Sequence, residues 1–423
     1  MAIKTPVDTR LAIEGGTPVR SEDDPLPGIF PRDVPQESYD NIREVLEKGL
    51  TSGYLPRFEQ EFAEVNGAKY CVSLANCTAT LHTIIAAMDI GPGKEVIVNP
   101  ITDLGSVAGI MAQGAIPIFP DVDIRTGNVT AETIEKVISE RTAAIIAVHW
   151  YGLLCPMDDI VALAKKHDIL LVEDVCQAPL AKYKGRNAGT LGDVGAFSFD
   201  AEKHLSGGHG GALLTDNKDI ADRVYLFGVS RGGVREERYG RKHVRFGLNM
   251  RFGELEAAFV LGMLHILEGQ NQRRRETAAA LSLRIEEDIP GLTPPYIPEG
   301  ADHIYWYYYL HVDPDAFTCD LWDLSDALIA EGLTRAEPGP WQLVPDSHTF
   351  LHTKTTVAGE SQWPWDHPMN EFAKDIEYSA DMVPIAKEHV DTTIRWNWTD
   401  KYTDQDVEDM ATILAKVTDR YRA

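Results

Sequence analysis

The chain has 423 residues, of which 44% are hydrophobic and 25% are charged, both close to the averages of globular proteins. At about 100–200 residues per domain, this length predicts two or three domains. Asp and Glu outnumber Lys and Arg by 65 to 40, so the formal net charge is −25. Because an acidic chain repels phosphates and anionic lipids, we expect neither nucleic acid nor a membrane as a partner.

The cysteines and the N-terminal residues indicate the cellular compartment. The five cysteines are scattered and form no C-x-x-C pair, which favours reduced core thiols over a disulfide framework or a zinc site. The N-terminus lacks the apolar run of a secretory signal, and no stretch approaches the roughly 18 apolar residues of a membrane helix. We therefore expect a cytoplasmic protein without a bound metal.

Between residues 66 and 215, short apolar runs alternate with segments of helical spacing. Amphipathic helices are expected at 130–137 and 158–167. Strands are expected at 70–74, 94–98, 115–119, 143–148, 169–172, 195–199 and 211–215. Apolar strands separated by helices predict an α/β fold with a mostly parallel sheet covered on both faces.

The pattern changes beyond about residue 250. A long helix is expected at 253–283, and its Arg273-Arg274-Arg275 run is interpreted as a solvated face or a subunit contact. An aromatic strand at 304–312 and helices at 321–331 and 404–421 indicate a smaller α+β domain, and 338–365 is expected to be a long structured loop. We divide the chain into a large domain, 1–265, and a small domain, 266–423.

An acid and a lysine follow two successive strands. Asp174 ends one buried strand, and Lys203 comes shortly after the next one. In open α/β sheets, ligands bind at the carboxyl ends of strands. Pyridoxal phosphate needs a lysine for a Schiff base and an acid opposite its pyridinium nitrogen, so this pair predicts that cofactor. The alternative is a structural salt bridge between the two side chains.

A turn of small residues precedes an apolar helix near residue 77. Cys77, Thr78 and Ala79 would offer backbone N–H groups, and Thr78 also a hydroxyl, at a helix N-terminus that favours a phosphate. The alternative is an ordinary Asn or Thr helix cap.

Six motifs together resemble one enzyme family. They are N-C-T-A-T (Asn76–Thr80), V-H-W-Y-G (Val148–Gly152), E-D-V-C-Q-A (Glu173–Ala178), S-F-D-A-E-K (Ser198–Lys203), G-G-H-G-G (Gly207–Gly211) and G-L-N-M-R-F-G-E-L-E-A-A (Gly247–Ala258). Their order and spacing resemble the DegT/DnrJ/EryC1/StrS aminotransferases, fold-type I pyridoxal phosphate enzymes that aminate keto sugars and keto cyclitols. The resemblance implies a mostly parallel seven-stranded sheet.

The resemblance also implies a role for each matching residue. Lys203 matches the Schiff-base lysine, Asp174 the partner of the pyridine nitrogen and Gln177 the partner of the ring hydroxyl. Ser198, Thr78 and Ala79, with Cys77 in the same turn, match the phosphate site. Asn249 matches an asparagine that reaches the phosphate of the neighbouring subunit, which implies a homodimer with shared active sites. Tyr54 and His149 are expected near the substrate, although a packed structural role for His149 is equally open.

Two positions depart from the family pattern. Asp103 stands in Pro100-Ile-Thr-Asp where the family usually has an aromatic that stacks on the cofactor, and His209 replaces a common acid. We expect both to face the substrate, where Asp103 could hydrogen-bond it and His209 changes the charge offered to it.

These features favour transfer of an amino group from glutamate or glutamine to a ketone on a sugar nucleotide or cyclitol. Such reactions belong to secondary-metabolite, antibiotic or cell-surface sugar biosynthesis. Asp103 and His209 motivate an alternative, a dehydratase, epimerase or ring-forming enzyme with the same cofactor. A third hypothesis is a regulatory protein that keeps the fold, but the presence of Lys203, Asp174 and Gln177 argues against it. The identity of the acceptor is not encoded in these motifs.

Overall fold

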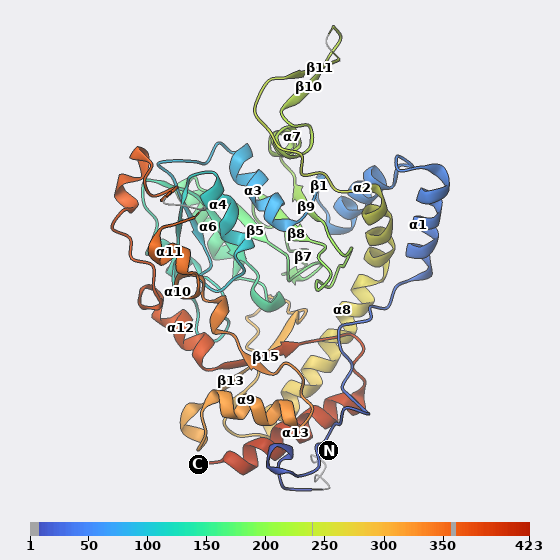
Figure 1. The fold of residues 1–423 in the computed structure, drawn as a ribbon, viewed down its shortest axis with the longest axis vertical. Coiled ribbons are helices and arrows are strands. Elements are labelled where there is room, and N and C mark those ends of the chain that lie inside the picture. Colours follow the sequence, from blue (N-terminus) through green and yellow to red (C-terminus); the bar gives the residue numbers. More distant parts are fainter. Residues whose placement is uncertain (1–7, 239, 357–360) are drawn as a thin grey trace.

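The computed structural model describes residues 8–238, 240–356 and 361–423. Its upper body in Figure 1 contains a large sheet, and its lower body contains a small sheet, with one long helix running between them. The first described residues, from Asp8, and the C-terminus both lie at the lower body. Residues 1–7 of the predicted large domain and 357–360 of the predicted loop fall outside the described residues.

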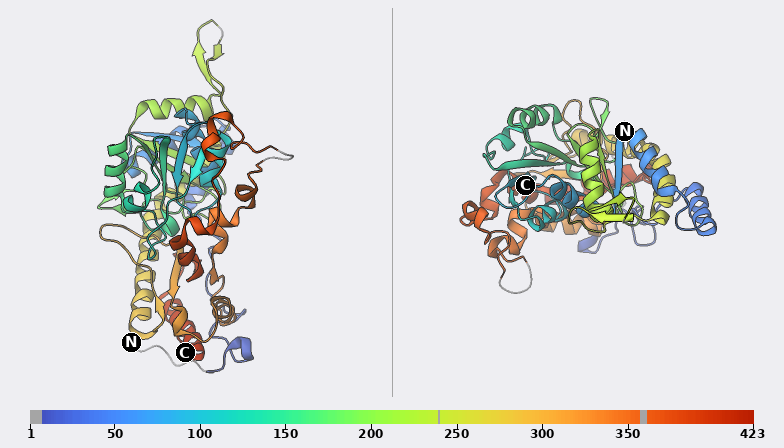
Figure 2. Two further views of the ribbon diagram at one scale, coloured as in Figure 1. Left: turned by 90° about the vertical axis from the view of Figure 1, so that its left-hand side faces the viewer. Right: turned by 90° about the horizontal axis from the view of Figure 1, so that it is seen from above.

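The large sheet has seven strands in the order β1-β9-β8-β5-β4-β2-β3. Only β9 runs antiparallel to its neighbours. The strands are β1 (Tyr70–Leu74), β2 (Glu95–Val98), β3 (Ile116–Ile118), β4 (Thr142–Val148), β5 (Leu170–Asp174), β8 (Val194–Ser198) and β9 (Gly211–Thr215). The left view of Figure 2 shows helices on both sides of the sheet. The predicted α/β fold and its mostly parallel sheet are confirmed.

Helices begin where the sequence supplies caps. Asn76, Thr130 and Thr403 each accept a hydrogen bond from the first turn that follows. The helices are α1 (Gln36–Lys48), α2 (Tyr54–Asn66), α3 (Cys77–Ala87), α4 (Gly105–Ala112), α5 (Ala131–Glu135), α6 (Met157–His167), α7 (Lys218–Val224), α8 (Glu254–Asp288), α9 (Leu321–Ala330), α10 (Val344–Ser347), α11 (Thr349–Thr353), α12 (Pro384–Asp391) and α13 (Asp404–Tyr421). None of the described helices is long and apolar enough to cross a bilayer.

The small sheet is antiparallel, with the order β12-β13-β15-β14. Its strands are β12 (Leu292–Thr293), β13 (Tyr307–Val312), β14 (Glu337–Pro338) and β15 (Thr393–Asn397). With α9 and α13 it forms the predicted α+β part. The strand expected at 304–312 begins only at Tyr307, because Tyr305 has a φ of 54°, which extended backbone does not permit.

Two short hairpins lie outside these sheets. One pairs β6 (Lys182–Tyr183) with β7 (Arg186–Asn187), and the other pairs β10 (Gly233–Glu236) with β11 (Gly240–His243). The β10–β11 hairpin projects away from the upper body (Figures 1 and 2). Its side chains are largely exposed, so within this chain it packs against little.

Two hydrophobic cores divide the chain differently from the predicted boundary at 265/266, which lies within α8. The first core surrounds the large sheet and includes side chains as late as Val390. The second core surrounds the small sheet and includes Leu11 and Leu26 from the N-terminal segment. The chain therefore crosses between the two bodies more than once, and the division 1–265 and 266–423 stays a prediction.

The arginine run of α8 makes contacts within the chain. Arg274 is buried and pairs with Asp400 at 2.6 Å, and Arg275 pairs with Asp302 at 3.0 Å. Arg273 donates to the backbone oxygen of Tyr402 at 2.8 Å. Burial lowers the pKa of Arg274 to about 10. The run ties α8 to the segments that follow it, so the expected solvated face was wrong for the buried Arg274, and a subunit contact stays a prediction.

Candidate active site

A cavity of about 500 Å³ lies at the carboxyl ends of β1, β5 and β8. It brings together eight of the predicted site residues from segments distant in the sequence. They are Cys77, Thr78, Asp103, Asp174, Gln177, Ser198, Lys203 and His209. This is the position at which open α/β sheets bind their ligands.

Asp174 is fixed at the bottom of this pocket. It is the last residue of β5 and is 4% exposed. Its Oδ2 accepts from the hydroxyl of Ser106 at 2.8 Å, and its Oδ1 accepts from the backbone N–H of Cys176 at 3.1 Å. Two donors of this kind stabilise the ionised carboxylate in one orientation. The acid is therefore ready to face a positively charged partner.

Lys203 extends from the turn after β8 toward an aromatic wall. Its Nζ lies 3.7 Å from the centre of the Trp306 ring, a cation–π contact. The indole N–H of Trp306 donates to the backbone oxygen of Glu202 at 3.2 Å, so the ring is held beside the lysine. No carboxylate within the described residues pairs with Lys203, which removes the alternative of a structural salt bridge to Asp174.

The turn before α3 supplies part of the predicted phosphate site. Thr78 is exposed at the pocket, and Ser198 ends β8 beside it. The backbone N–H of Ala79 instead donates to Oδ1 of Asn76 at 2.7 Å. Ala79 therefore takes part in the helix cap, and its role as a phosphate ligand stays a prediction. Small residues crowd this turn: a Cβ on Gly105 would lie 2.7 Å from Oγ1 of Thr78.

Gln177 is oriented by its carbonyl oxygen. That oxygen accepts from the backbone N–H of Tyr151 at 2.6 Å, and the Tyr151 hydroxyl donates to Oε1 of Gln342 at 2.7 Å. In the described part of the chain, the Gln177 Nε2 group has no hydrogen-bond acceptor, so it remains available to a ligand in the pocket.

The two departures from the family pattern both lie at the pocket. Asp103 is exposed there, with one carboxylate oxygen bound to the backbone N–H of Gly105 at 2.8 Å. His209 is also exposed, with Nε2 at 3.5 Å from the Nδ2 of Asn76. Both can meet a substrate without a structural rearrangement.

Cys77, Asp174 and Cys176 could in principle hold a metal, since their ligand atoms lie within 4.8 Å of one another. Burial raises the pKa of the Cys77 thiol, and it raises that of Cys176 further. A metal binds the thiolate, which burial disfavours here. Asp174 is also already oriented by two donors. The absence of a metal stays a prediction.

Three predicted residues lie away from the pocket. The Tyr54 hydroxyl is within hydrogen-bond distance of Asn41 and Glu44, at 3.1 and 3.0 Å, so it packs α2 against α1. His149 is fully buried, with Nε2 at 3.1 Å from Glu173, which supports the packed structural role left open for it. Asn249 is exposed and accepts from Arg251 at 2.8 Å. Within this chain, none of the three can contact a ligand in the pocket.

The structure adds residues that sequence reasoning missed. Ser106 holds Asp174, and Trp306, Tyr307, Trp341 and Gln342 form a wall that comes from the C-terminal half. The aromatic strand and the Trp-rich segment were visible in the sequence, but only the fold shows which rings face the pocket. Trp341 is half exposed at the pocket, whereas Trp365 is buried in the first core.

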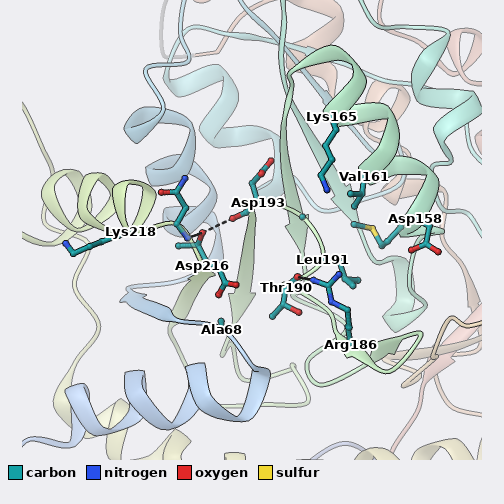
Figure 3. Close-up of a pocket in the computed structure, with 15 residues that line it drawn as sticks. Ala68, Asp158, Val161, Lys165, Arg186, Thr190, Leu191, Asp193, Asp216 and Lys218 are labelled. Atoms are coloured by element: carbon teal, nitrogen blue, oxygen red, sulfur yellow. Dashed lines mark hydrogen bonds between the residues drawn. The ribbon is translucent and has the colours of Figure 1, made fainter.

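A larger hollow of about 630 Å³ lies at the opposite edge of the sheet. Figure 3 shows its side chains, which include Lys165, Arg186, Asp193 and Asp216 around Leu191. Its charged residues are exposed. This hollow contains none of the predicted site residues.

Comparisons with known proteins identify the class. The spore coat polysaccharide biosynthesis protein SpsC of Bacillus subtilis is 36% identical over 300 residues, 67% of this chain and 76% of that protein. The L-glutamine:2-deoxy-scyllo-inosose aminotransferase of Micromonospora echinospora is 33% identical over 70% of this chain and 75% of that protein. An aminotransferase structure from Psychrobacter cryohalolentis, 26% identical, aligns with 94% of this chain and 99% of that chain at a TM-score of 0.79.

The fold and the pocket thus define a pyridoxal-phosphate-dependent aminotransferase of fold type I. The sequence profile of the DegT/DnrJ/EryC1/StrS aminotransferase family matches residues 33–336, and the chain belongs to that family. The resemblance inferred from the motifs, the enzyme class and the cofactor are confirmed.

Proposed function

We propose that this enzyme transfers the amino group of glutamate or glutamine to a ketone on a sugar nucleotide or cyclitol. The observation that carries the proposal is the convergence of Lys203, Asp174 and Gln177 on one pocket. The names of the relatives supply the acceptor class, since they include a dTDP-amino-sugar transaminase, a GDP-perosamine synthase and inosose aminotransferases. We further propose a place in secondary-metabolite, antibiotic or cell-surface sugar biosynthesis.

The residues present fit pyridoxal phosphate. Asp174 would face the pyridine nitrogen, Nε2 of Gln177 would donate to the ring oxygen, and the hydroxyls of Thr78 and Ser198 would hold the phosphate. A side chain at position 105 would crowd the Thr78 hydroxyl, and the glycine avoids this. When bound, the cofactor supplies an electron sink for the bond broken at the substrate carbon.

Side chains of the protein orient the cofactor, transfer the proton and restrain the lysine. The Asp174 carboxylate, held in place by Ser106 and the Cys176 N–H, would face the ring nitrogen of the bound cofactor and favour its protonated form. Nζ of Lys203 carries the proton to and from the substrate carbon. Trp306 restrains the lysine, and Trp306 and Trp341 both line the pocket.

We also propose a homodimer with shared active sites and a cytoplasmic location. Asn249 is exposed and lies close in sequence to the projecting β10–β11 hairpin, so both can reach a second subunit. The five cysteines are free, the state that a reducing compartment maintains.

The experiment supplies L-glutamine or L-glutamate together with a nucleotide-linked keto sugar or 2-deoxy-scyllo-inosose. We expect 2-oxo acid and aminated acceptor to form in equal amounts. Product formed without consumption of the donor would contradict transamination and favour the dehydratase or epimerase, for which the exposed Asp103 is the motivating observation. A variant of Lys203 that kept its biological effect would favour the regulatory hypothesis.

A further inference from the structure

Asp103 and Trp341 meet at the pocket, although they are far apart in the sequence. The segments 101–103 and 341–343 pair as antiparallel backbone, through one bridge and a hydrogen bond of 3.0 Å. Asp103 ends one segment and Trp341 begins the other, so the antiparallel pairing brings the two residues together. Both line the pocket, and both side chains are exposed, Trp341 by 51%.

Each of these two side chains keeps a group available to a ligand. One carboxylate oxygen of Asp103 accepts from the backbone N–H of Gly105 at 2.8 Å, and the other has no partner in the described part of the chain. Trp341 keeps half of its surface exposed. A carboxylate pairs with an ammonium group directly, and the face of an indole ring attracts the same charge. Together they form a receptor for an ammonium group.

The charges around the pocket also favour a cation. Four carboxylates line it against one lysine: Asp103, Asp174, Asp200, Glu202 and Lys203. Across the described residues, none of the four carboxylates has an ion-pair partner. Arg32 donates to the backbone oxygen of Ala201, and Arg395 lies behind the ring of Tyr307, but neither arginine lines the pocket. With one acid opposite the ring nitrogen, three carboxylates remain for the acceptor.

The aromatic wall of the pocket already holds one ammonium group. Nζ of Lys203 lies 3.7 Å from the centre of the Trp306 ring, and no carboxylate of the described chain lies within ion-pair distance of it. A ring face alone therefore accommodates a positive charge in this pocket. Trp341 presents a second ring at the same pocket, and there a carboxylate stands beside it.

We propose that Asp103 and Trp341 bind an ammonium group of the acceptor. The acceptor is then a keto cyclitol or keto sugar that already carries an amino group and no phosphate. The inference rests on the proposed transamination and names its acceptor class. A nucleoside diphosphate brings two negative charges, which the three carboxylates would repel. An amino-acid donor with a neutral side chain adds no net charge, because its ammonium group offsets its carboxylate.

The test compares three ketones with the holoenzyme. The first carries an ammonium group, the second a hydroxyl at the same position, and the third is a nucleotide-linked keto sugar. The acceptor half-reaction is measured in single turnover after reaction with L-glutamine. We expect kcat/KM for the ammonium ketone to exceed that for the hydroxyl ketone at least about tenfold. Raising the salt from about 0.05 M to about 0.5 M should narrow this gap, because salt screens charges at exposed groups.

Two substitutions separate the charge from the ring. Asp103→Asn should lower the ratio of kcat/KM for the ammonium ketone to that for the hydroxyl ketone by about 5- to 30-fold, and Trp341→Leu by about 3- to 10-fold. Helix α9 offers a matched control pair, since Trp322 is 55% exposed and Asp326, one turn later, is also exposed. Trp322→Leu and Asp326→Asn should leave the ratio unchanged.

Calorimetric titration gives a readout that does not depend on turnover. The wild type should bind a diamino cyclitol at least about tenfold more tightly than the matching polyol without amines, and Asp103→Asn should reduce this preference to less than about threefold. Equal affinity of the wild type for the two compounds would contradict the proposed receptor.

The remaining outcomes distinguish this inference from the function on which it rests. A wild type that prefers the nucleotide-linked ketone would overturn the inference and would mean that cations of a second subunit complete the pocket. Equal losses with the ammonium and hydroxyl ketones in Asp103→Asn would mean that Asp103 only shapes the pocket. If neither L-glutamine nor L-glutamate yields a 2-oxo acid, the proposed transamination fails. A working donor half-reaction without preference for the ammonium ketone refutes this inference alone.

Discussion

The two edges of the large sheet offer two hollows of similar size and different character. At the carboxyl edge, Asp174 is buried and held by two donors, and Lys203 lies against Trp306. At the opposite edge, the hollow is larger, but Lys165 and Asp193 on its rim are exposed. Size therefore does not distinguish an active site from a surface hollow. What distinguishes the carboxyl edge is polar groups that the protein has desolvated and oriented before a ligand arrives.

The most direct test of whether only the carboxyl edge holds the active site is to remove one lysine from each edge. Lys203→Ala should lower turnover at least about 10⁴-fold, because no other group at that point forms the covalent link or moves the proton. The cofactor absorption at roughly 410–430 nm should be lost, and borohydride treatment should leave no cofactor attached at residue 203. Lys165→Ala should keep both activity and spectrum. Comparable losses in the two variants would contradict the distinction drawn here.

Replacing one acid at each edge tests the same difference between the two hollows with a smaller chemical change. Asp174→Asn removes the charge opposite the ring nitrogen at a cost of about 3–4 kcal/mol, which is about 10²–10³ in rate. Asp193 accepts from the backbone N–H of Leu171 at 2.8 Å, so Asp193→Asn should lower thermal stability slightly and leave turnover unchanged. Steady-state kinetics and thermal melting measure both effects. Full activity in Asp174→Asn would remove this residue from the proposed mechanism.

The elements of the carboxyl edge were predictable because their signals are local. The strands that end near Asp174 and Ser198 are short apolar runs. The helical segments between the earlier strands predict a mostly parallel sheet, to which both strands belong. Once strands and order are known, side chains at their carboxyl ends must converge. The helix 404–421 was predicted with its observed bounds, because its cap and its amphipathic pattern are both strong.

The remaining site residues depend on contacts that no local pattern encodes. Trp306 reaches Lys203 only because Tyr305 takes a positive φ and turns the chain before β13. Tyr54 is expected near the substrate because its motif resembles a substrate-facing segment, whereas within this chain its hydroxyl meets α1. The N–H of Ala79 points to Asn76 because the cap geometry of Asn76 decides its direction, and no local pattern predicts this. Such outcomes follow from tertiary packing over long separations in the sequence.

A buried histidine of α12, His389, packs against Tyr309 of β13, whereas the hollow at the opposite edge has no histidine among its lining residues. Burial, and then the neighbouring His311, lower the pKa of His389 to about 3. Between that value and the ordinary value of about 6.5, the unfolded chain binds the proton and the folded chain does not. Stability must therefore fall as the pH is lowered through this range, by about 2 kcal/mol from this group at pH 5.

His389→Asn tests this linkage. Nδ1 of His389 lies 2.8 Å from the backbone oxygen of Ile124, and the asparagine amide can replace that donor. The variant should melt below the wild type at pH 7.5, and the gap should narrow at pH 5, because asparagine takes up no proton on unfolding. His167→Asn, on an exposed position of α6, is the control and should show no such change. A gap that does not depend on pH would exclude a neutral, buried His389.

The smallest expected effect comes from the group that orients the acid. The Ser106 hydroxyl donates to Asp174 at 2.8 Å, and hydrogen bonds to a charged group contribute about 1.5 kcal/mol. Ser106→Ala should therefore lower kcat by about tenfold. Since Ser106 acts through Asp174 and not on the donor, KM for the donor should change little. Thr215→Val removes a hydroxyl that donates to the backbone oxygen of Asp193 at 2.7 Å at the opposite edge, and kcat should be unaffected. If both variants keep full kcat, orientation of the acid by Ser106 contributes nothing to catalysis, and the backbone N–H of Cys176 alone suffices to hold it.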